Sequence, residues 1–414
     1  QCKLMGSVCF KDTRSCETGS GSGKGTQPAS EQFKACASVI AAGKVRFLSA
    51  SWLCLQPKTW KVLRCQDLPA EAFLDPRVAA RLFSERNSTG LAAISYRWLT
   101  KAHPDPDGFH FNTLHLFLTK VPDSSVRGFF WDYASLPQTG PDGKRAPEHE
   151  AIFKEGLGVV NFIYGSPNVL MLQLRQMPQE SPVAPYSESG WCTFEEVCGS
   201  ILKPRDFFND LSLARDWFET DWTSANYENN VHPNATRELR KICTMSAPAP
   251  MHPDALHDLI MTKTFTNGAD QEFVSRKYRK FFLSVCVGIS DLRFANRTYD
   301  DGWTDKEGEL LAQSLPEFKD CERIWLGGHA LGDLALTRIA DALTKLPKLR
   351  TFENQGECGY GQTGIREFMR RLPEMPALQG LTLHGDVDEE TQKEFESEWK
   401  RLGKKGTLYF GDWD

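Results

Sequence analysis

The chain has 414 residues, of which 40% are hydrophobic and 25% are charged, and its formal net charge is -5. This length accommodates two or three domains, and the composition is that of a globular protein with enough apolar residues for a core. The slight acidic balance argues against a non-specific nucleic-acid binder, and no apolar run reaches the roughly 18 residues that a membrane-spanning helix needs.

The twelve cysteines are scattered, and none forms a CxxC pair. Their even number leaves a disulfide framework open, but reduced thiols in a cytoplasmic protein fit the scatter better. His252 and His257, with Asp254 and Asp258, are the candidate metal ligands. Their five-residue spacing does not place the two imidazoles on one helical face, so we expect a polar loop there and no metal site.

Residues 1–45 are weakly patterned, and the Gly/Ser tract at 19–25 predicts a flexible N-terminal segment. Within it, GSGSGKGTQ (19–27) is similar to the phosphate loop of adenylate kinases. A working phosphate loop follows a hydrophobic strand and opens a helix, whereas here KDTRSCET precedes the segment and Pro28 follows it. A nucleotide phosphotransferase acting through Lys24 is therefore a remote alternative.

Residues 46–87 form a predicted helical lead-in, and the pattern changes at 88. LAAISY (91–96), VRGFFWD (126–132) and NVLMLQL (168–174) are short apolar runs bounded by Pro, Gly or Asp, as in strands buried on both faces. The intervening stretches are long enough for crossover helices, and KEGLGVVNFIY (154–164) is one candidate. The pattern predicts a parallel α/β domain over 88–205.

A further helix is predicted in SGWCTFEEVCGSIL (189–202), where two glutamates are adjacent. At about 100° per residue, one face of this helix collects four apolar side chains: Phe194, Val197, Cys198 and Ile201. Glu196 then points away from this face into water. Glu195 lies at its flank, one turn after Trp191 and on the same side.

Residues 206–305 are predicted to be a mixed, mostly helical bridging region. After it, CERIWL (321–326), LRTFEN (349–354) and LQGLTL (378–383) share a loose L-x-x-L-x-L pattern and begin 28 and 29 residues apart. The pattern resembles leucine-rich repeats of the ribonuclease-inhibitor type, with His329 where such repeats usually have Asn. It implies a short strand-and-helix array over 306–390 that binds a protein partner, followed by a C-terminal helix and tail over 391–414.

Three motifs of the α/β region occur in the order of a known family. ISYRW (94–98), FFWDYASLPQ (129–138) and W-C-x-x-E (191–195) together resemble the TIR domain. The series is also similar to the related HET domain of fungal incompatibility proteins, with IYGSPNVLML (163–172) as a further matching element. The resemblance covers about a quarter to a third of the chain.

The resemblance implies a flavodoxin-like parallel sheet and cleavage of the nicotinamide–ribose bond of NAD, with NAD as substrate rather than bound cofactor. Glu195 takes the place of the catalytic carboxylate. The substrate-binding residues implied are those after the first strand, the Asp that ends the second strand, and the indole before the glutamate: Tyr96, Arg97, Trp98, Asp132 and Trp191. Self-association is also implied.

Two departures from the family leave a second hypothesis open. YASLPQTGPDGK replaces the usual loop after Asp132, and a Pro-rich stretch (176–190) separates the last predicted strand from the Glu195 helix. The alternative is therefore a non-catalytic scaffold in which the TIR-like and repeat segments only bind proteins.

Overall fold

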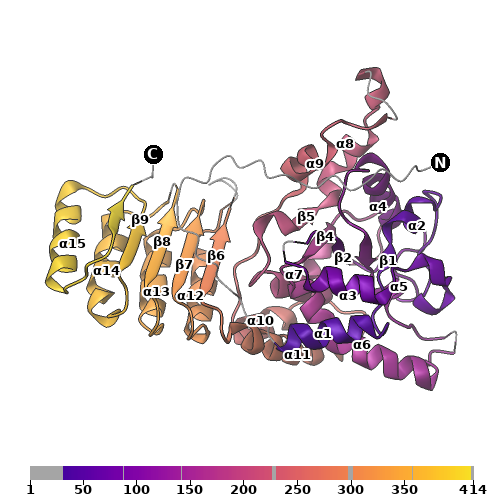
Figure 1. Ribbon diagram of the computed structural model, residues 1–414, viewed down its shortest axis with the longest axis horizontal. Helices are drawn as coiled ribbons and strands as arrows, with labels where there is room; N and C mark the ends of the chain where they lie inside the picture. The colour runs from indigo at the N-terminus through magenta and orange to yellow at the C-terminus, as the bar shows by residue number, and fades with distance from the viewer. Residues whose placement is uncertain are drawn as a thin grey trace.

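The computed structural model describes residues 31–86, 88–140, 142–225, 230–296, 302–356 and 358–411. Two five-stranded sheets lie at opposite ends of the molecule, and helices α10 (Pro253–Met261) and α11 (Asp270–Cys286) lie between them (Figure 1). The predicted α/β class is confirmed, because strands alternate with helices and nearly all strand pairs are parallel.

The first sheet has the order β1-β3-β2-β4-β5. Its strands are β1 (Leu48–Ser49), β2 (Leu91–Tyr96), β3 (Gly128–Phe130), β4 (Val169–Leu174) and β5 (Phe208–Asp210). The short β1 is antiparallel to β3, and the other neighbours are parallel. The chain passes from β2 to β3 on one side and then crosses to β4 on the other, so the sheet has a topological switch point at β2.

The three strands predicted from apolar runs are confirmed as β2, β3 and β4, and the helix predicted at 154–164 lies inside α6 (Pro147–Gly165). β1 and β5 lie outside the range 88–205 assigned to this domain. Each has only two or three residues, too few for a readable period, and each is held by pairing with a strand distant in sequence.

Helices cover both faces of the first sheet. Leu91 and Ala93 of β2 belong to one hydrophobic cluster, which includes residues of α6 and α7 (Gly190–Gly199). Ala92 and Ile94 belong to a second cluster, which includes residues of α4 (Phe109–Lys120). Successive side chains of a strand point to opposite faces, so the clusters assign α7 to one face of β2 and α4 to the other.

The prediction of a flexible segment over 1–45 is wrong for its last part. Residues 31–41 form α1 (Glu31–Ala41), whose Cys36 and Ile40 are fully buried against α3 (Pro76–Ser84) and α6. Within 46–87, the range predicted to be helical, the structure has α2 (Ala50–Cys54) and α3. A further short helix, α5 (Asp132–Ser135), follows β3. The GSGSGKGTQ segment with Lys24 lies outside the described residues.

In the bridging region, α8 (Arg215–Glu219) and α9 (Ala235–Cys243) precede α10 and α11. Helix α11 connects the two units through its aromatic side chains. Phe281 packs on Phe162 of α6 at a ring-centroid distance of 5.3 Å, and Phe282 packs on Phe318 of the second unit at 5.9 Å. One hydrophobic cluster therefore continues from α7 through α11 into the second unit.

The second sheet is all-parallel and follows chain order from β6 to β10. Its strands are β6 (Asp291–Ala295), β7 (Arg323–Gly327), β8 (Thr351–Gln355), β9 (Gly380–Leu383) and β10 (Leu408–Phe410). Four helices stack in the same order: α12 (Asp305–Ser314), α13 (Asp333–Leu343), α14 (Gln362–Arg371) and α15 (Glu389–Arg401) (Figure 1). β7, β8 and β9 confirm the predicted strands, whereas β6 and β10 extend the array beyond 306–390.

His329 follows β7 and joins neighbouring segments of the array. Its ring is 2% exposed and stacks on Trp303 at a centroid distance of 4.3 Å. The backbone N–H of Trp303 donates to Nδ1 at 3.1 Å, and Nε2 donates to the carbonyl of Phe294 at 3.2 Å. Burial lowers the pKa of this imidazole to about 4, so the neutral ring satisfies both backbone groups.

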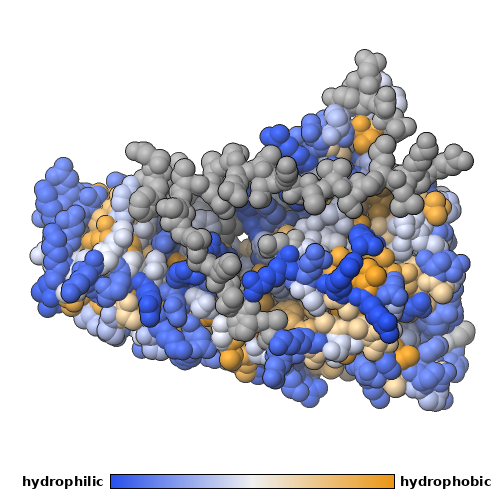
Figure 2. Space-filling view, in the orientation of Figure 1, coloured by the Kyte–Doolittle hydropathy of each residue, from blue (hydrophilic) through white to orange (hydrophobic). Residues whose placement is uncertain are grey.

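Within the described ranges, no helix combines the length and apolar character needed to cross a bilayer. Of the nine cysteines that the structure describes, seven are buried, and Cys54 and Cys358 are partly exposed. On the face shown in Figure 2, hydrophilic side chains dominate and hydrophobic residues are interspersed among them.

Candidate active site

The candidate site lies where β2 ends, at the switch point of the first sheet. In open α/β sheets ligands bind outside the carboxyl ends of the strands at such a point. Tyr96 is the last residue of β2, Arg97 and Trp98 follow it directly, and Asp132 follows β3 on the neighbouring strand. Tertiary folding thus brings together the motif residues that the sequence analysis selected at 96–98 and 132.

Glu195 reaches this edge from α7. The helix begins after Ser189, whose hydroxyl accepts from the backbone N–H of Cys192, and Glu195 follows on the second turn. Ser95, on the α7 face of β2, donates its hydroxyl to Glu195 Oε2 at 2.6 Å. Glu195 is only 8% exposed, and no Lys, Arg or His among the described residues lies within ion-pairing distance of it.

The environment of Glu195 disfavours its charged form. Burial raises the pKa of this carboxyl well above its usual value, and the negative charge of Asp132 raises it further, while the Ser95 hydrogen bond opposes the shift. Desolvation is the larger effect, because one hydroxyl donor does not replace a full hydration shell. The site therefore favours the protonated form of this carboxyl more than water does.

Two tyrosines that the sequence analysis did not select complete this side of the site. Tyr186 is 3% exposed, and its hydroxyl lies 2.7 Å from Ser95 Oγ. Because the Ser95 proton is engaged by Glu195, Tyr186 donates to Ser95. Tyr164 of α6 is also buried and donates to the carbonyl of Ile94 at 2.9 Å.

Asp132 occupies the other face of β2. Its Oδ1 accepts from the Tyr96 hydroxyl at 2.7 Å and from the backbone N–H of Tyr133 at 2.7 Å, and its Oδ2 accepts from Trp98 Nε1 at 3.1 Å. Burial raises the pKa of Asp132, and these three donors oppose the shift. Tyr96, Trp98 and Asp132 therefore form one hydrogen-bonded cluster, on the α4 side and away from Ser95.

Arg97 lies on the Glu195 side but does not pair with it. The residue is 9% exposed, Nη2 donates to Thr264 Oγ1 at 3.1 Å, and Nη1 donates to the Thr264 carbonyl at 3.4 Å. Its Nε has no hydrogen-bond partner among the described residues. A buried guanidinium with an unused N–H donor is an arrangement that can take an anionic ligand.

Trp191 lies one turn before Glu195 on α7 and contacts α11. Its Nε1 donates to Asp270 Oδ2 of α11 at 3.0 Å, and its ring packs on Phe194 and Phe273. These contacts attach α7 to α11. The period of α7 could not show that α11 would cover this side of the helix.

Glu196 corrects an expectation from the sequence, because it does not point into water. It forms an ion pair with Arg175 and accepts from Gln173 Nε2 at 2.6 Å, and only 20% of its side chain is exposed. Burial raises the pKa of Glu196, and the charge of Arg175 opposes the shift. The twin glutamates thus differ in their partners: Glu195 has a hydroxyl, and Glu196 has a cation.

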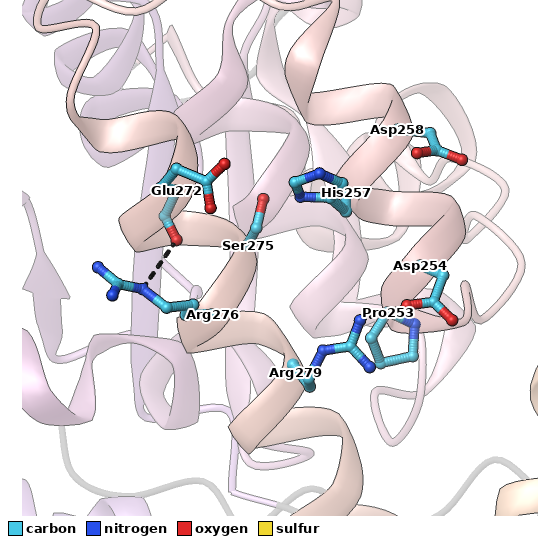
Figure 3. Close-up of a pocket in the computed structure, with 8 residues that line it drawn as sticks. All are labelled: Pro253, Asp254, His257, Asp258, Glu272, Ser275, Arg276 and Arg279. Atoms are coloured by element: carbon cyan, nitrogen blue, oxygen red, sulfur yellow. Dashed lines mark hydrogen bonds and ion pairs between the residues drawn. The ribbon is translucent and has the colours of Figure 1, made fainter.

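A separate groove of about 320 Å³ lies between α10 and α11 (Figure 3). The predicted polar loop around His257 is wrong, since His257 is on α10 and faces Ser275 of α11 across this groove. Ser275 Oγ has no partner among the described residues, while Arg279 is ion-paired with Asp254. The groove is open and lined mainly by charged side chains, unlike the largely apolar sites that enclose small ligands. The described residues hold no group of three metal-ligating side chains.

Searches against protein-family models and against curated proteins found no match to this chain.

Proposed function

We propose that the first α/β unit is a TIR- or HET-like domain that cleaves the nicotinamide–ribose bond of NAD, with Glu195 as its catalytic carboxylate. The observation that supports this proposal is the burial of Glu195 at the switch point of a parallel sheet, with no ion-pair partner for it in the part of the chain that the structure describes. A buried carboxyl without a counter-ion is unfavourable for stability, and such groups concentrate at functional sites. The motif order from Ile94 to Glu195 supports the same assignment.

The chemistry needs one carboxylate. When the C1′–N bond breaks, its electron pair goes to the pyridinium ring, which leaves as neutral nicotinamide without a proton from an acid. The ribose carbon becomes oxocarbenium-like, and Glu195 stabilises this positive charge until water adds. The products are nicotinamide, ADP-ribose and one proton.

The raised pKa of Glu195 suits this role if the substrate itself is cationic at the reacting ring. The pyridinium charge of bound NAD favours the ionised carboxylate, so binding is expected to release the Glu195 proton. We assign to Arg97, whose buried guanidinium has an unused N–H, the binding of the pyrophosphate or a ribose hydroxyl. Asp132 and Tyr96 support the edge of the site from the opposite face.

The second unit is proposed to be a leucine-rich-repeat array that binds a protein partner. Its outer sheet face carries a register row in which Arg293, Trp325 and Glu353 are neighbours on β6, β7 and β8. All three side chains are at least partly exposed, and an indole between opposite charges is typical of interface anchors. Within this proposal the chain is a cytoplasmic signalling protein that self-associates.

The test of the enzymatic proposal is NAD consumption by the purified full chain at high protein concentration. Wild type is expected to form nicotinamide and ADP-ribose, and Glu195→Gln is expected to form none. Glu238→Gln is the matched control, because it neutralises a carboxylate that pairs with Lys241 on α9, outside the site, and should retain turnover. No NAD loss in the wild type would contradict the proposal, and equal loss in wild type and Glu195→Gln would contradict the assignment of the residue.

One observation favours the second candidate, a non-catalytic scaffold. Tyr186 lies over Ser95 and Glu195 and is itself buried, so the site is covered in this conformation. A scaffold would keep the carboxyl covered permanently. If the wild type binds no NAD in calorimetry, the scaffold is the better account of both units.

A further inference from the structure

The segment from Arg175 to Ser189, here called the strap, connects β4 to α7 and passes over the carboxyl edge of the first sheet. Between Arg175 and Glu188, Tyr186 is the one buried residue, and all others are half-buried or exposed. The contacts of the buried Tyr186 side chain therefore hold this stretch against the rest of the protein. Tyr186 reaches the site directly, because its hydroxyl binds the same Ser95 that binds Glu195.

The two ends of the strap are fastened to the protein. At its start, Arg175 forms the ion pair with Glu196 of α7, and the backbone N–H of Gln176 donates to Ser212 Oγ at 2.9 Å. At its end, the Ser187 carbonyl accepts from Lys263 Nζ at 2.8 Å, and Glu188 is bonded to Thr264.

The middle of the strap has no such attachment. From Met177 to Ala184 the described hydrogen bonds are local: the Ser181 N–H donates to the Pro178 carbonyl, and the Val183 N–H donates to Ser181 Oγ. Exposed backbone with few long-range bonds marks a segment that opens at low free-energy cost. The prolines at 178, 182 and 185 keep its open forms few and extended.

Arg175 contacts both Glu196 and Tyr186, the residue that covers the site. The Arg175 guanidinium lies over the Tyr186 ring, 5.1 Å from its centroid, while it pairs with Glu196. The ion pair therefore fixes the first residue of the strap and keeps the Arg175 guanidinium against the Tyr186 ring. Glu196 fastens the strap to the helix that carries Glu195.

We propose that the strap is a gate over Glu195. The Tyr186 side chain blocks access to the carboxyl, and the Arg175–Glu196 ion pair holds the strap in the closed position. Opening moves Tyr186 off Ser95 and admits a ligand to the buried carboxyl; closing returns the hydroxyl to Ser95 and excludes water. Tyr186 is an access-controlling and positioning residue, since it acts on Glu195 through Ser95. The inference rests on the proposed function only for the identity of the ligand that enters.

The gate can be tested without any substrate by carboxyl labelling of the folded full chain. The probe is glycine ethyl ester coupled by a carbodiimide, with the label on Glu195 measured by peptide mass spectrometry. We expect low labelling in the wild type, a several-fold increase in Tyr186→Ala, and a smaller increase in Arg175→Gln. Arg205→Gln is the matched control, since Arg205 pairs with Asp206 outside the strap and its loss should leave Glu195 protected.

Unchanged Glu195 labelling in both Tyr186→Ala and Arg175→Gln would overturn the gate. If Tyr186→Ala unfolds, Tyr186→Phe replaces it: the ring remains, the bond to Ser95 is lost, and a labelling rate at or below that of the wild type would count against the gate. NAD consumption is measured on the same samples. Increased labelling without NAD consumption would keep the gate and contradict the proposed enzyme, whereas NAD consumption with unchanged labelling would do the reverse.

Discussion

Glu195 and Asp132 approach the same strand from opposite faces. Ser95 connects Glu195 to the α7 side of β2, and the next residue, Tyr96, connects Asp132 to the α4 side. Neither carboxyl has a lysine or arginine partner among the described residues, and the charge of Asp132 adds to the raised pKa of Glu195. A buried acid and a half-buried acid on opposite faces of one strand therefore make the ionisation of Glu195 dependent on its surroundings, and predictions can be tested on that basis.

The first prediction concerns the stability of Glu195→Gln. Because the folded state raises the pKa of Glu195, unfolding releases a proton above the ordinary value of 4.5, and the free energy of unfolding decreases as the pH rises from there. The neutral amide does not titrate. We therefore expect the variant to match the wild type at acidic pH and to be the more stable protein at alkaline pH.

Urea unfolding across this pH range measures the effect. Glu196→Gln should not reproduce the alkaline gain, since it removes one partner of an ion pair. A stability difference between wild type and Glu195→Gln that does not change with pH would mean that the pKa of Glu195 is not raised.

The second prediction concerns Asp132→Asn. The carboxylate accepts three hydrogen bonds, and an amide group at Oδ2 would place its N–H₂ against Trp98 Nε1, which is also a donor. An unsatisfied buried donor costs about 1 to 3 kcal/mol of unfolding free energy. In the double variant with Trp98→Phe the competing donor is absent, so the combined loss should be less than the sum of the single losses. Additive losses would contradict this pairing.

The third prediction concerns His329 and acid stability. Above pH 6.5 the imidazole is neutral in both states, and below it the unfolded chain binds a proton that the folded chain does not bind until about pH 4. The free energy of unfolding should therefore fall by roughly 3 kcal/mol as the pH decreases through this window. His329→Asn keeps a donor and an acceptor but does not titrate, so its unfolding free energy should vary less with pH. Equal slopes for the two proteins would refute the role of His329.

The fourth prediction compares two glycines. A Cβ at Gly190, the first residue of α7, would lie 1.9 Å from the Phe265 ring, so Gly190→Ala should displace the start of α7 and lower the melting temperature. Gly158 is exposed in the middle of α6 with open space around its Cα, so Gly158→Ala should stabilise the protein by about 0.5 to 1 kcal/mol through helix propensity. Thermal unfolding of both variants provides the comparison, and equal shifts would contradict the close packing at Gly190.

The sequence determined the elements that have a strong local pattern. β2, β3 and β4 are continuous apolar runs, and a run of this kind is stable only when both faces are covered. The helical period correctly assigned the buried face of α7, where Phe194 and Cys198 are 0% exposed. The spacing of the repeated strands also follows from sequence, because each strand repeats one local pattern.

Only the tertiary structure decided the surroundings of those elements. A helical period gives the direction of a side chain around the helix axis. It cannot show which distant segment will pack against that side of the helix. Arg175 pairs with Glu196, Asp270 of α11 binds Trp191, and Tyr186 binds Ser95, and each contact joins segments that are separate in the sequence. The burial of Glu195, on which its proposed chemistry depends, is the sum of these long-range contacts.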